Sequence, residues 1–203
     1  MTEPRRTQEE RRSEAERRLL SAAAELIAET GPSGVTLANI GERAGYSRGL
    51  ATHHFGSKGA MMRRLVDSVT TDFRREVLAA SATESALDEA MGLVRAYFHA
   101  LGHPKPANRA RLVLWADAVA AGSTDVRSAV LASDREFRDE LTKRIERGVS
   151  TGEFAGSVDP RALATVIIGM LRGVALQSML DDGVDLDACR VEVETVLTGR
   201  LVR

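Results

Sequence analysis

Residues Thr36–Met61, TLANIGERAGYSRGLATHHFGSKGAM, decide how the rest of the chain is organised. Thr36 is a good N-cap for a first short helix, and Gly45 ends it because glycine adopts the left-handed backbone that a sharp turn needs. Ser47 then caps a second short helix. The inward positions of the two helices are Leu37, Ile40, Ala44, Leu50 and Phe55. This pattern predicts a helix-turn-helix, whose second helix can enter the major groove of DNA.

The same stretch closely resembles the DNA-binding domain of the tetracycline-repressor (TetR) family of transcriptional regulators. The matching residues are Thr36, Ile40, Ala44-Gly45, Ser47, Gly49, His53-His54-Phe55 and Ser57-Lys58. Four positions depart from the family pattern. Gly41 stands where the family usually has Ala, Tyr46 where it has a small apolar residue, and Ala51-Thr52 where it often has Leu-Tyr.

The second helix supplies the candidate contacts with bases. Arg48 can donate two hydrogen bonds to guanine, Gly49 permits a close backbone approach, and Leu50 can touch a thymine methyl. The family resemblance implies contacts with phosphate at Thr36, Thr52, His54 and Lys58. The complete set of predicted DNA-binding residues is Thr36, Arg48, Gly49, Leu50, Thr52, His53, His54 and Lys58. The alternative is a three-helix packing unit with a solvated polar face.

Composition favours a cytoplasmic, helix-rich protein. Hydrophobic residues make up 43% of the 203 residues and aromatic residues only 4%. The N-terminus is charged and carries no apolar signal segment, and no run of 18 uncharged apolar residues predicts a membrane span. Cys189 is the single cysteine, which excludes an internal disulfide framework.

Bulk charge does not by itself predict nucleic-acid binding, since the formal net charge is −1. Residues 1–60 hold nine Lys/Arg against eight Asp/Glu, so the local balance is +1. DNA binding must then depend on where the charges lie, and a dimer would double the phosphate contacts. Residues 1–13 are expected to form a mobile arm before a helix that begins near Ser13. The arm's arginines could reach DNA, or the arm could be a solvated tail; they are Arg5, Arg6, Arg11 and Arg12.

Helical periodicity continues to the C-terminus, and no period-two alternation is present. We therefore predict an all-α protein with an N-terminal three-helix DNA-binding domain over 1–62. A long helix from Lys58 would join it to a helical ligand-binding and dimerisation domain over 63–203.

A ligand cavity in the second domain is implied by the family resemblance. Candidates for its lining are Phe73, Met91, Arg95, Phe98, Trp115, Met170 and Gln177; the alternative, which each residue taken singly favours, is plain core. Arg95 and Gln177 are of most interest, because polar groups inside an apolar cavity fix the orientation of a ligand.

The last two helices are predicted to form a homodimer interface, as the resemblance also implies. The helix after Asp159-Pro160 is apolar on more than one face, so it must be buried on more than one side. Two copies could form a four-helix bundle. The predicted interface residues are Leu163, Ile167, Met170, Val174, Val193, Val196 and Leu197.

Other chemistry has little support. His99 and His103 share the spacing of two metal ligands, but no acidic residue completes a known motif and Gly102 and Pro104 should fray the helix there. No nucleophile–base pair or phosphate-binding loop stands out, so we expect no enzyme activity, no metal and no cofactor. The sequence thus predicts a ligand-responsive repressor that binds double-stranded DNA; the alternative is a ligand-independent, architectural DNA-binding protein.

Overall fold

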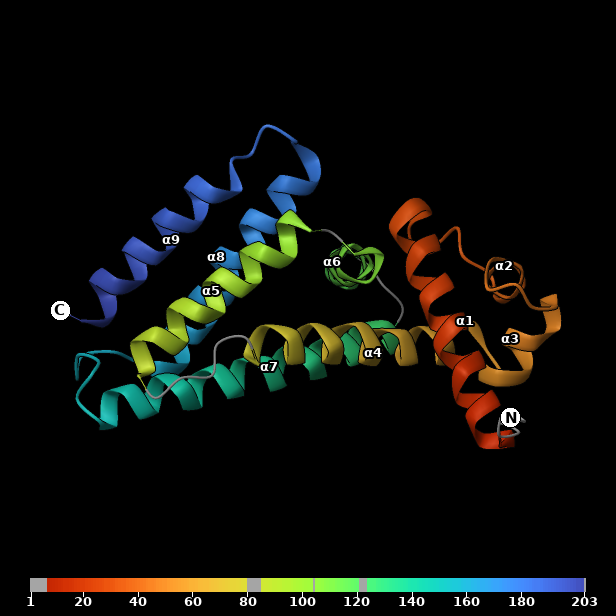
Figure 1. Ribbon diagram of the computed structural model, residues 1–203, viewed down its shortest axis with the longest axis horizontal. Helices are drawn as coiled ribbons and strands as arrows, with labels where there is room; N and C mark the ends of the chain where they lie inside the picture. The colour runs from red at the N-terminus through yellow and green to blue at the C-terminus, as the bar shows by residue number, and fades with distance from the viewer. Residues whose placement is uncertain (1–6, 80–84, 104, 121–123, 203) are drawn as a thin grey trace, which may run out of the picture. The chain divides into compact units, whose positions relative to one another are not determined.

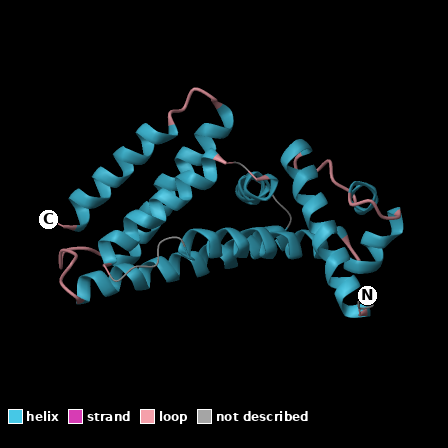
Figure 2. Cartoon of the chain, in the orientation of Figure 1, coloured by secondary structure: helices cyan, strands magenta, loops and turns pink. Residues whose placement is uncertain are grey.

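A computed structural model describes residues 7–79, 85–103, 105–120 and 124–202, and within these segments every regular element is a helix (Figures 1 and 2). The all-α prediction is confirmed. The helices are α1 (Gln8–Thr30), α2 (Leu37–Arg43), α3 (Arg48–Phe55), α4 (Lys58–Ala79), α5 (Ala86–Gly102), α6 (Pro106–Ala120), α7 (Thr124–Ser150), α8 (Pro160–Leu180) and α9 (Leu186–Leu201).

The described residues form two compact units. The first contains the chain up to Thr70 together with Arg109–Val130, and the second contains Thr71–Asn108 and the chain from Leu131 onward. The division falls inside α4, α6 and α7, so each of these helices has residues in both units. The expected functional boundary between residues 62 and 63 stays a prediction.

Helix α1 begins earlier than expected. Thr7 and Glu10 form a capping box, in which the Thr7 hydroxyl accepts from the Glu10 N–H and the Glu10 carboxylate accepts from the Thr7 N–H at 2.7 Å. The predicted start near Ser13 is therefore wrong, and Arg11 and Arg12 lie on the exposed surface of α1 instead of in a mobile arm. Arg5 and Arg6 lie outside the described residues.

The core of the first unit joins α1 to the helix-turn-helix and the start of α4. Apolar side chains from all four helices and the α1–α2 turn are almost wholly buried, including Leu19, Ile27, Val35, Ile40, Ala51, Met61 and Leu65. The small apolar faces of α2 and α3 are thus covered by two longer helices, which fixes the position of the helix-turn-helix.

The second unit is a packed set of helices in which α5, α8 and α9 contact one another, as Figure 1 shows. Asp159 caps α8, which has Pro160 in its first turn, and the Asp185 side chain caps α9. Both helices have the expected bounds. Glu89 of α5 is buried and accepts from Arg144 and Arg147 of α7. These ion pairs hold α5 and α7 together within the unit.

Helix α8 is long and apolar enough to cross a membrane by length and composition alone. Arg172 lies in its middle and makes two hydrogen bonds, of 3.0 and 2.8 Å, to the Asp134 carboxylate on α7. Its inner face also packs in the core of the unit, where Ala164, Ile167 and Leu171 are buried. The apolar character of α8 is therefore explained in part by packing inside the protein.

Candidate nucleic-acid interface

Helix α3 presents a polar face to solvent. Ala51 is the α3 residue that packs into the core, whereas Arg48, Gly49, Thr52 and His53 are exposed. Leu50 and Phe55, expected to point inward, are only half-buried. Because the Ala51 side chain is small, α3 lies close to the core on that side. The polar side chains on its other side stay exposed and can contact another molecule.

A close contact between α2 and α3 sets the direction of α3. A Cβ atom added to Gly41 would lie 2.6 Å from the Ser47 carbonyl oxygen and 3.4 Å from the Arg48 Cα. Gly45 has a φ of 77°, and the Tyr46 N–H returns to the Gly41 carbonyl at 2.9 Å. The unusual glycine at position 41 therefore permits a shorter distance between the two helices than alanine would.

Arg48 is ion-paired to Glu42 through its Nε atom, although its side chain is 78% exposed. The bond leaves the rest of the guanidinium at the solvent-facing side of α3. The importance of Glu42 was missed from the sequence, because a pair six residues apart across a turn has no helical spacing to suggest it.

Thr36 and Lys58 lie at helix N-termini, and the half-buried His54 lies near the end of α3. Thr36 caps α2, where its hydroxyl accepts from the Asn39 N–H at 3.1 Å and Asn39 completes a capping box. Ser57 accepts from the Ala60 N–H at 3.1 Å, and the exposed Lys58 follows as the first residue of α4. The N-terminal turns of α2 and α4 are thus suited to phosphate oxygens, because free N–H groups and the helix dipole favour negative charge there.

Two contacts attach this region to α1. Arg43 forms a two-pronged ion pair with Glu29, with both N–O distances at 2.8 Å, and lies 3.5 Å from Glu25. The hydrogen bonds that the Arg43 guanidinium donates to Glu29 lower the pKa of the Glu29 carboxyl. The Arg18 guanidinium lies 4.9 Å from the centre of the Tyr46 ring. The departure at Tyr46 therefore supplies a contact between the turn and α1.

Two family profiles match this chain. Residues 19–65 match bacterial regulatory proteins of the tetR family, and residues 86–201 match the C-terminal part of BetI-type transcriptional repressors. The second match alone spans more than half of the chain.

The chain belongs to the TetR family. It is a DNA-binding transcriptional regulator of the repressor type. The resemblance to this family that the helix-turn-helix residues indicated is confirmed. Among its relatives, an HTH-type transcriptional regulator BetI 1 of Chromohalobacter salexigens is 26% identical over 177 residues, which span 86% of this chain and 84% of the relative. The HTH-type transcriptional repressor KstR2 of Rhodococcus jostii is 30% identical over 145 residues, or 70% of this chain and 68% of that one.

Solved structures support the same fold for this TetR-family chain. A TetR transcriptional regulator from Chloroflexus aurantiacus aligns with a TM-score of 0.83 at 19% identity, covering 94% of this chain and 98% of the other. A transcriptional regulator from Saccharomonospora viridis, solved in complex with choline, aligns with a TM-score of 0.79 at 23% identity over 94% and 99%.

The predicted effector-binding residues of this TetR-family protein do not form one group. Phe73 is buried with its ring edge-on to Tyr97, 5.3 Å between centres, and Met91 is buried beside Thr198 of α9. Arg95 and Phe98 line a common cleft, described below. Met170 is half-buried, and Trp115 is half-buried in the part of the chain grouped with the first unit. Gln177 is exposed, so it does not lie inside an apolar cavity of this chain as expected.

The predicted dimer residues divide into two groups. Leu163, Ile167, Val193 and Leu197 are already buried within the single chain, where they pack α8 and α9 into the unit; the expectation that they face a partner is corrected. Met170 and Val174 are half-buried, and Val196 is 55% exposed. Periodicity identified apolar helices correctly, but it could not tell which apolar face packs inside.

The opposite face of α8 carries a stripe of small and apolar residues that are exposed or half-buried. Its residues alternate four and three positions apart: Ala162, Val166, Gly169, Gly173, Leu176 and Leu180. Val166 is 53% exposed and Leu180 is 90% exposed. A Cβ atom at Gly169 or Gly173 would meet nothing within 4 Å. Alternating spacing of this kind is typical of helices that pack against a second helix.

The two histidines considered as metal ligands stack on each other. The His99 and His103 ring centres are 4.4 Å apart, and the His103 Nδ1 atom lies 3.1 Å from the His99 carbonyl oxygen. Among the described residues, no three His, Cys, Asp or Glu side chains gather as a metal site would require.

Proposed function

We propose that this TetR-family protein acts in the cytoplasm as a homodimeric repressor, which binds a pseudo-palindromic operator and is released by a small-molecule effector. In this proposal residues 1–62 bind DNA and residues 63–203 bind the effector and the partner. The DNA-binding set is the predicted one, with Arg48 as the principal base contact and Lys58, Thr36, Thr52 and His54 as contacts to phosphate.

The observation that carries the proposal is the exposed polar face of α3. Arg48, Thr52 and His53 face solvent while Ala51 holds the helix to the core. Arginine donates two hydrogen bonds to the O6 and N7 atoms of guanine, and such a pair contributes about 1–3 kcal/mol of discrimination. Arg48 at the start of α3 can therefore supply sequence preference, and Lys58 at the start of α4 can add affinity.

In this proposal the protein dimerises through the outer face of α8, so that two α3 helices bind the two halves of the operator. The stripe, with outward-facing Gly169 and Gly173, permits the close approach of a second α8. On α9 the exposed apolar residues Val191 and Val196 can extend this contact. The two α3 helices of such a dimer would need to be about 34–36 Å apart to enter successive major grooves.

Effector control follows from the continuity of α4. This helix begins at Lys58, beside the proposed phosphate contacts, and ends among residues of the second unit. An effector that displaced α4 would change the separation of the two α3 helices. A coupling free energy of about 1–3 kcal/mol is enough to change affinity about five- to 150-fold. The choline-bound relative supports a small organic effector.

Two substitutions test the DNA-binding face, measured by fluorescence anisotropy on a selected operator and on scrambled DNA over a range of salt concentrations. Arg48→Ala should reduce the preference for operator over scrambled DNA by about tenfold or more. Lys58→Ala should weaken binding to both DNAs and lower the salt slope by about one. Arg75→Ala, an exposed cation at the far end of α4, is the matched control and should change neither. If Arg48→Ala and Lys58→Ala both behave like Arg75→Ala, the proposed face is wrong.

The alternative is a DNA-binding protein without an effector. Equal affinity for operator and scrambled DNA would favour that architectural role. A thermal-shift screen with metabolites separates the two functions as well, because a ligand that binds the native state raises the melting temperature.

A further inference from the structure

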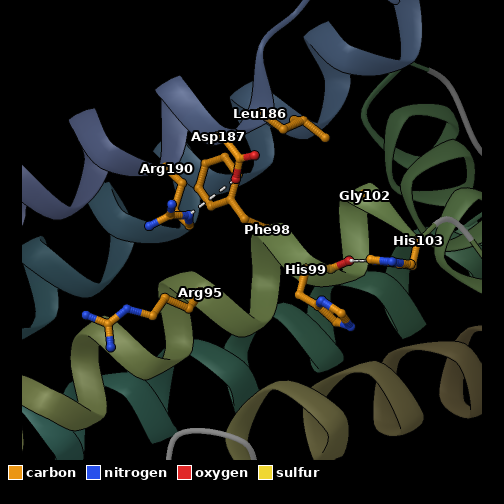
Figure 3. Close-up of a pocket in the computed structure, with 8 residues that line it drawn as sticks. All are labelled: Arg95, Phe98, His99, Gly102, His103, Leu186, Asp187 and Arg190. Carbon is orange, nitrogen blue, oxygen red and sulfur yellow. Dashed lines mark hydrogen bonds and ion pairs between the residues drawn. The ribbon is translucent and has the colours of Figure 1, made fainter.

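A cleft of about 460 Å³ lies in the second unit between the C-terminal half of α5 and the first turns of α9 (Figure 3). Its volume is in the range of small-molecule sites. Arg95 and Phe98 line it from α5, and Leu186, Asp187 and Arg190 line it from α9. All of these residues belong to one unit, so the cleft is formed within it.

The cleft wall carries more positive than negative charge. Arg95 Nε and Arg190 Nη1 both donate to the same oxygen of Glu194, at 3.1 and 3.2 Å. One carboxylate, 20% exposed, is therefore shared between two guanidinium groups. Asp187 lies 3.8 Å from Arg190 Nε, but its side chain is 95% exposed and solvent screens its charge. Among the residues that line the cleft, two guanidinium groups therefore face one carboxylate, an excess of one positive charge; Glu194 is not a lining residue, and with it the formal charges balance.

Both guanidinium groups retain N–H donors for a ligand. Arg95 is 58% exposed, and its bonds within the described residues use only Nε. Arg190 is 29% exposed and makes its shorter contact through Nη1. A planar guanidinium fork matches the two oxygens of a carboxylate, which makes arginine well suited to bind such groups.

The remaining wall is apolar or aromatic. Figure 3 shows the Phe98 side chain directed from α5 toward α9, where Leu186 lies. The stacked rings of His99 and His103 continue the α5 wall beyond Phe98. A ligand that fits these surroundings combines one negative charge with an apolar body, because the charge meets the arginines and the body covers Phe98 and Leu186.

We propose that this cleft binds a small monocarboxylate with an aliphatic or aromatic body, held by Arg95 and Arg190. The proposal that such a ligand is the effector rests on the proposed repressor function, whereas the binding itself does not. Glu194 competes with the ligand for both guanidinium groups and so sets the affinity.

Isothermal titration of the full chain with octanoate tests the site, with octanamide, octylamine and inorganic phosphate as comparison probes. Octanoate should bind, and the neutral amide and the cationic amine, which share its eight-carbon chain, should bind at least about tenfold more weakly because they lack the charge that the arginines recognise. Phosphate should not bind comparably, since it offers nothing to the apolar wall. Phosphate binding without octanoate binding would overturn the assignment.

Substitutions at the cleft should change the affinity for octanoate in opposite directions. Arg95→Gln with Arg190→Gln should weaken octanoate binding about tenfold or more, because two charge-assisted hydrogen bonds are lost. Glu194→Gln should instead tighten binding, because a neutral amide competes less strongly than a carboxylate for the two guanidinium groups. Arg75→Gln, exposed on α4 outside the cleft, is the control. If the double variant does not fold, the single substitution Arg95→Gln, at an exposed side chain, is measured in its place. Unchanged octanoate affinity in the arginine variants would overturn the site.

DNA binding is measured separately. Release of DNA by octanoate from the wild type, but not from the arginine variants, would support the effector role. Octanoate binding without DNA release would remove that role and keep the site. A wild type that binds octanoate but no DNA would contradict the repressor function alone.

Discussion

Arg48 at the start of α3 donates from Nε to the carboxylate of Glu42 on α2, so the residue best placed to read a base is already paired within the chain. The Arg48 side chain is 78% exposed and that of Glu42 48%, so this ion pair contributes little to the free energy of folding. Its effect is on position: the pair limits the directions in which the guanidinium can point before DNA arrives. Glu42 also places a negative charge close to the proposed DNA face.

Glu42→Gln should therefore raise affinity for DNA of any sequence and reduce the preference for operator. The general increase follows from the lost repulsion between the carboxylate and phosphate, and the reduced preference follows from the freer Arg48. Anisotropy titrations on operator and scrambled DNA measure both. Asp182→Asn, exposed after α8, is the control for a changed net charge. A uniform loss of affinity would contradict this role of Glu42.

Gly41→Ala should destabilise the first unit by about 1–3 kcal/mol, because the new methyl group overlaps the Ser47 carbonyl oxygen unless α3 moves. Thermal or urea unfolding measures the change. Gly49→Ala is a matched control, since a Cβ at that exposed helical position meets nothing within 4 Å. It should keep or raise stability by up to about 1 kcal/mol. Equal stability of the two variants would show that α2 and α3 tolerate a wider separation.

Val166→Glu should dissociate the proposed dimer. The substitution would place a charge from each copy in the apolar contact between the two α8 helices, and it should raise the dimer dissociation constant at least about 100-fold. Val119→Glu, at an exposed valine on α6, is the control. Sedimentation analysis gives the oligomeric state. If Val166→Glu leaves the assembly unchanged, the outer face of α8 is not the interface.

Arg43→Gln should alter how stability depends on pH. The Arg43 guanidinium lowers the pKa of Glu29 in the folded chain, so this contribution is present above the usual glutamate range and is lost as the pH falls through the folded value. Wild type should consequently lose more stability than Arg43→Gln between about pH 5 and about pH 3. Denaturant unfolding at several pH values measures the difference, which high salt should reduce because the pair is exposed. Parallel pH profiles would contradict this account.

Much of the local structure could be predicted because its signals are local. Thr36, Ser57, Asp159 and Gly45 mark helix ends at the expected positions. The start of α1 was missed although its signal was present, since Thr7 and Glu10 have capping-box spacing. The remainder depends on tertiary packing. Only the folded chain reveals that position 41 lies against the Ser47 carbonyl, or which apolar face of α8 is covered.

The same limit applies to the sites. The sequence indicated the DNA-binding face because its residues fall within one short motif. It indicated Arg95 and Phe98 but not Arg190, since residues nearly 100 positions apart share no spacing. Gln177 was grouped with them as a polar side chain inside a cavity that the family resemblance implies, although that side chain is exposed.

Selection of binding sites from a random pool of DNA duplexes tests the central claim most directly. A dimer that reads DNA through two α3 helices should enrich an inverted repeat whose half-site centres are one DNA turn apart, about 10–10.5 base pairs, or a multiple of it. Arg48→Ala should lose that enrichment at a symmetric pair of positions. A pool with no enriched repeat, or a repeat that Arg48→Ala still selects unchanged, would contradict the account.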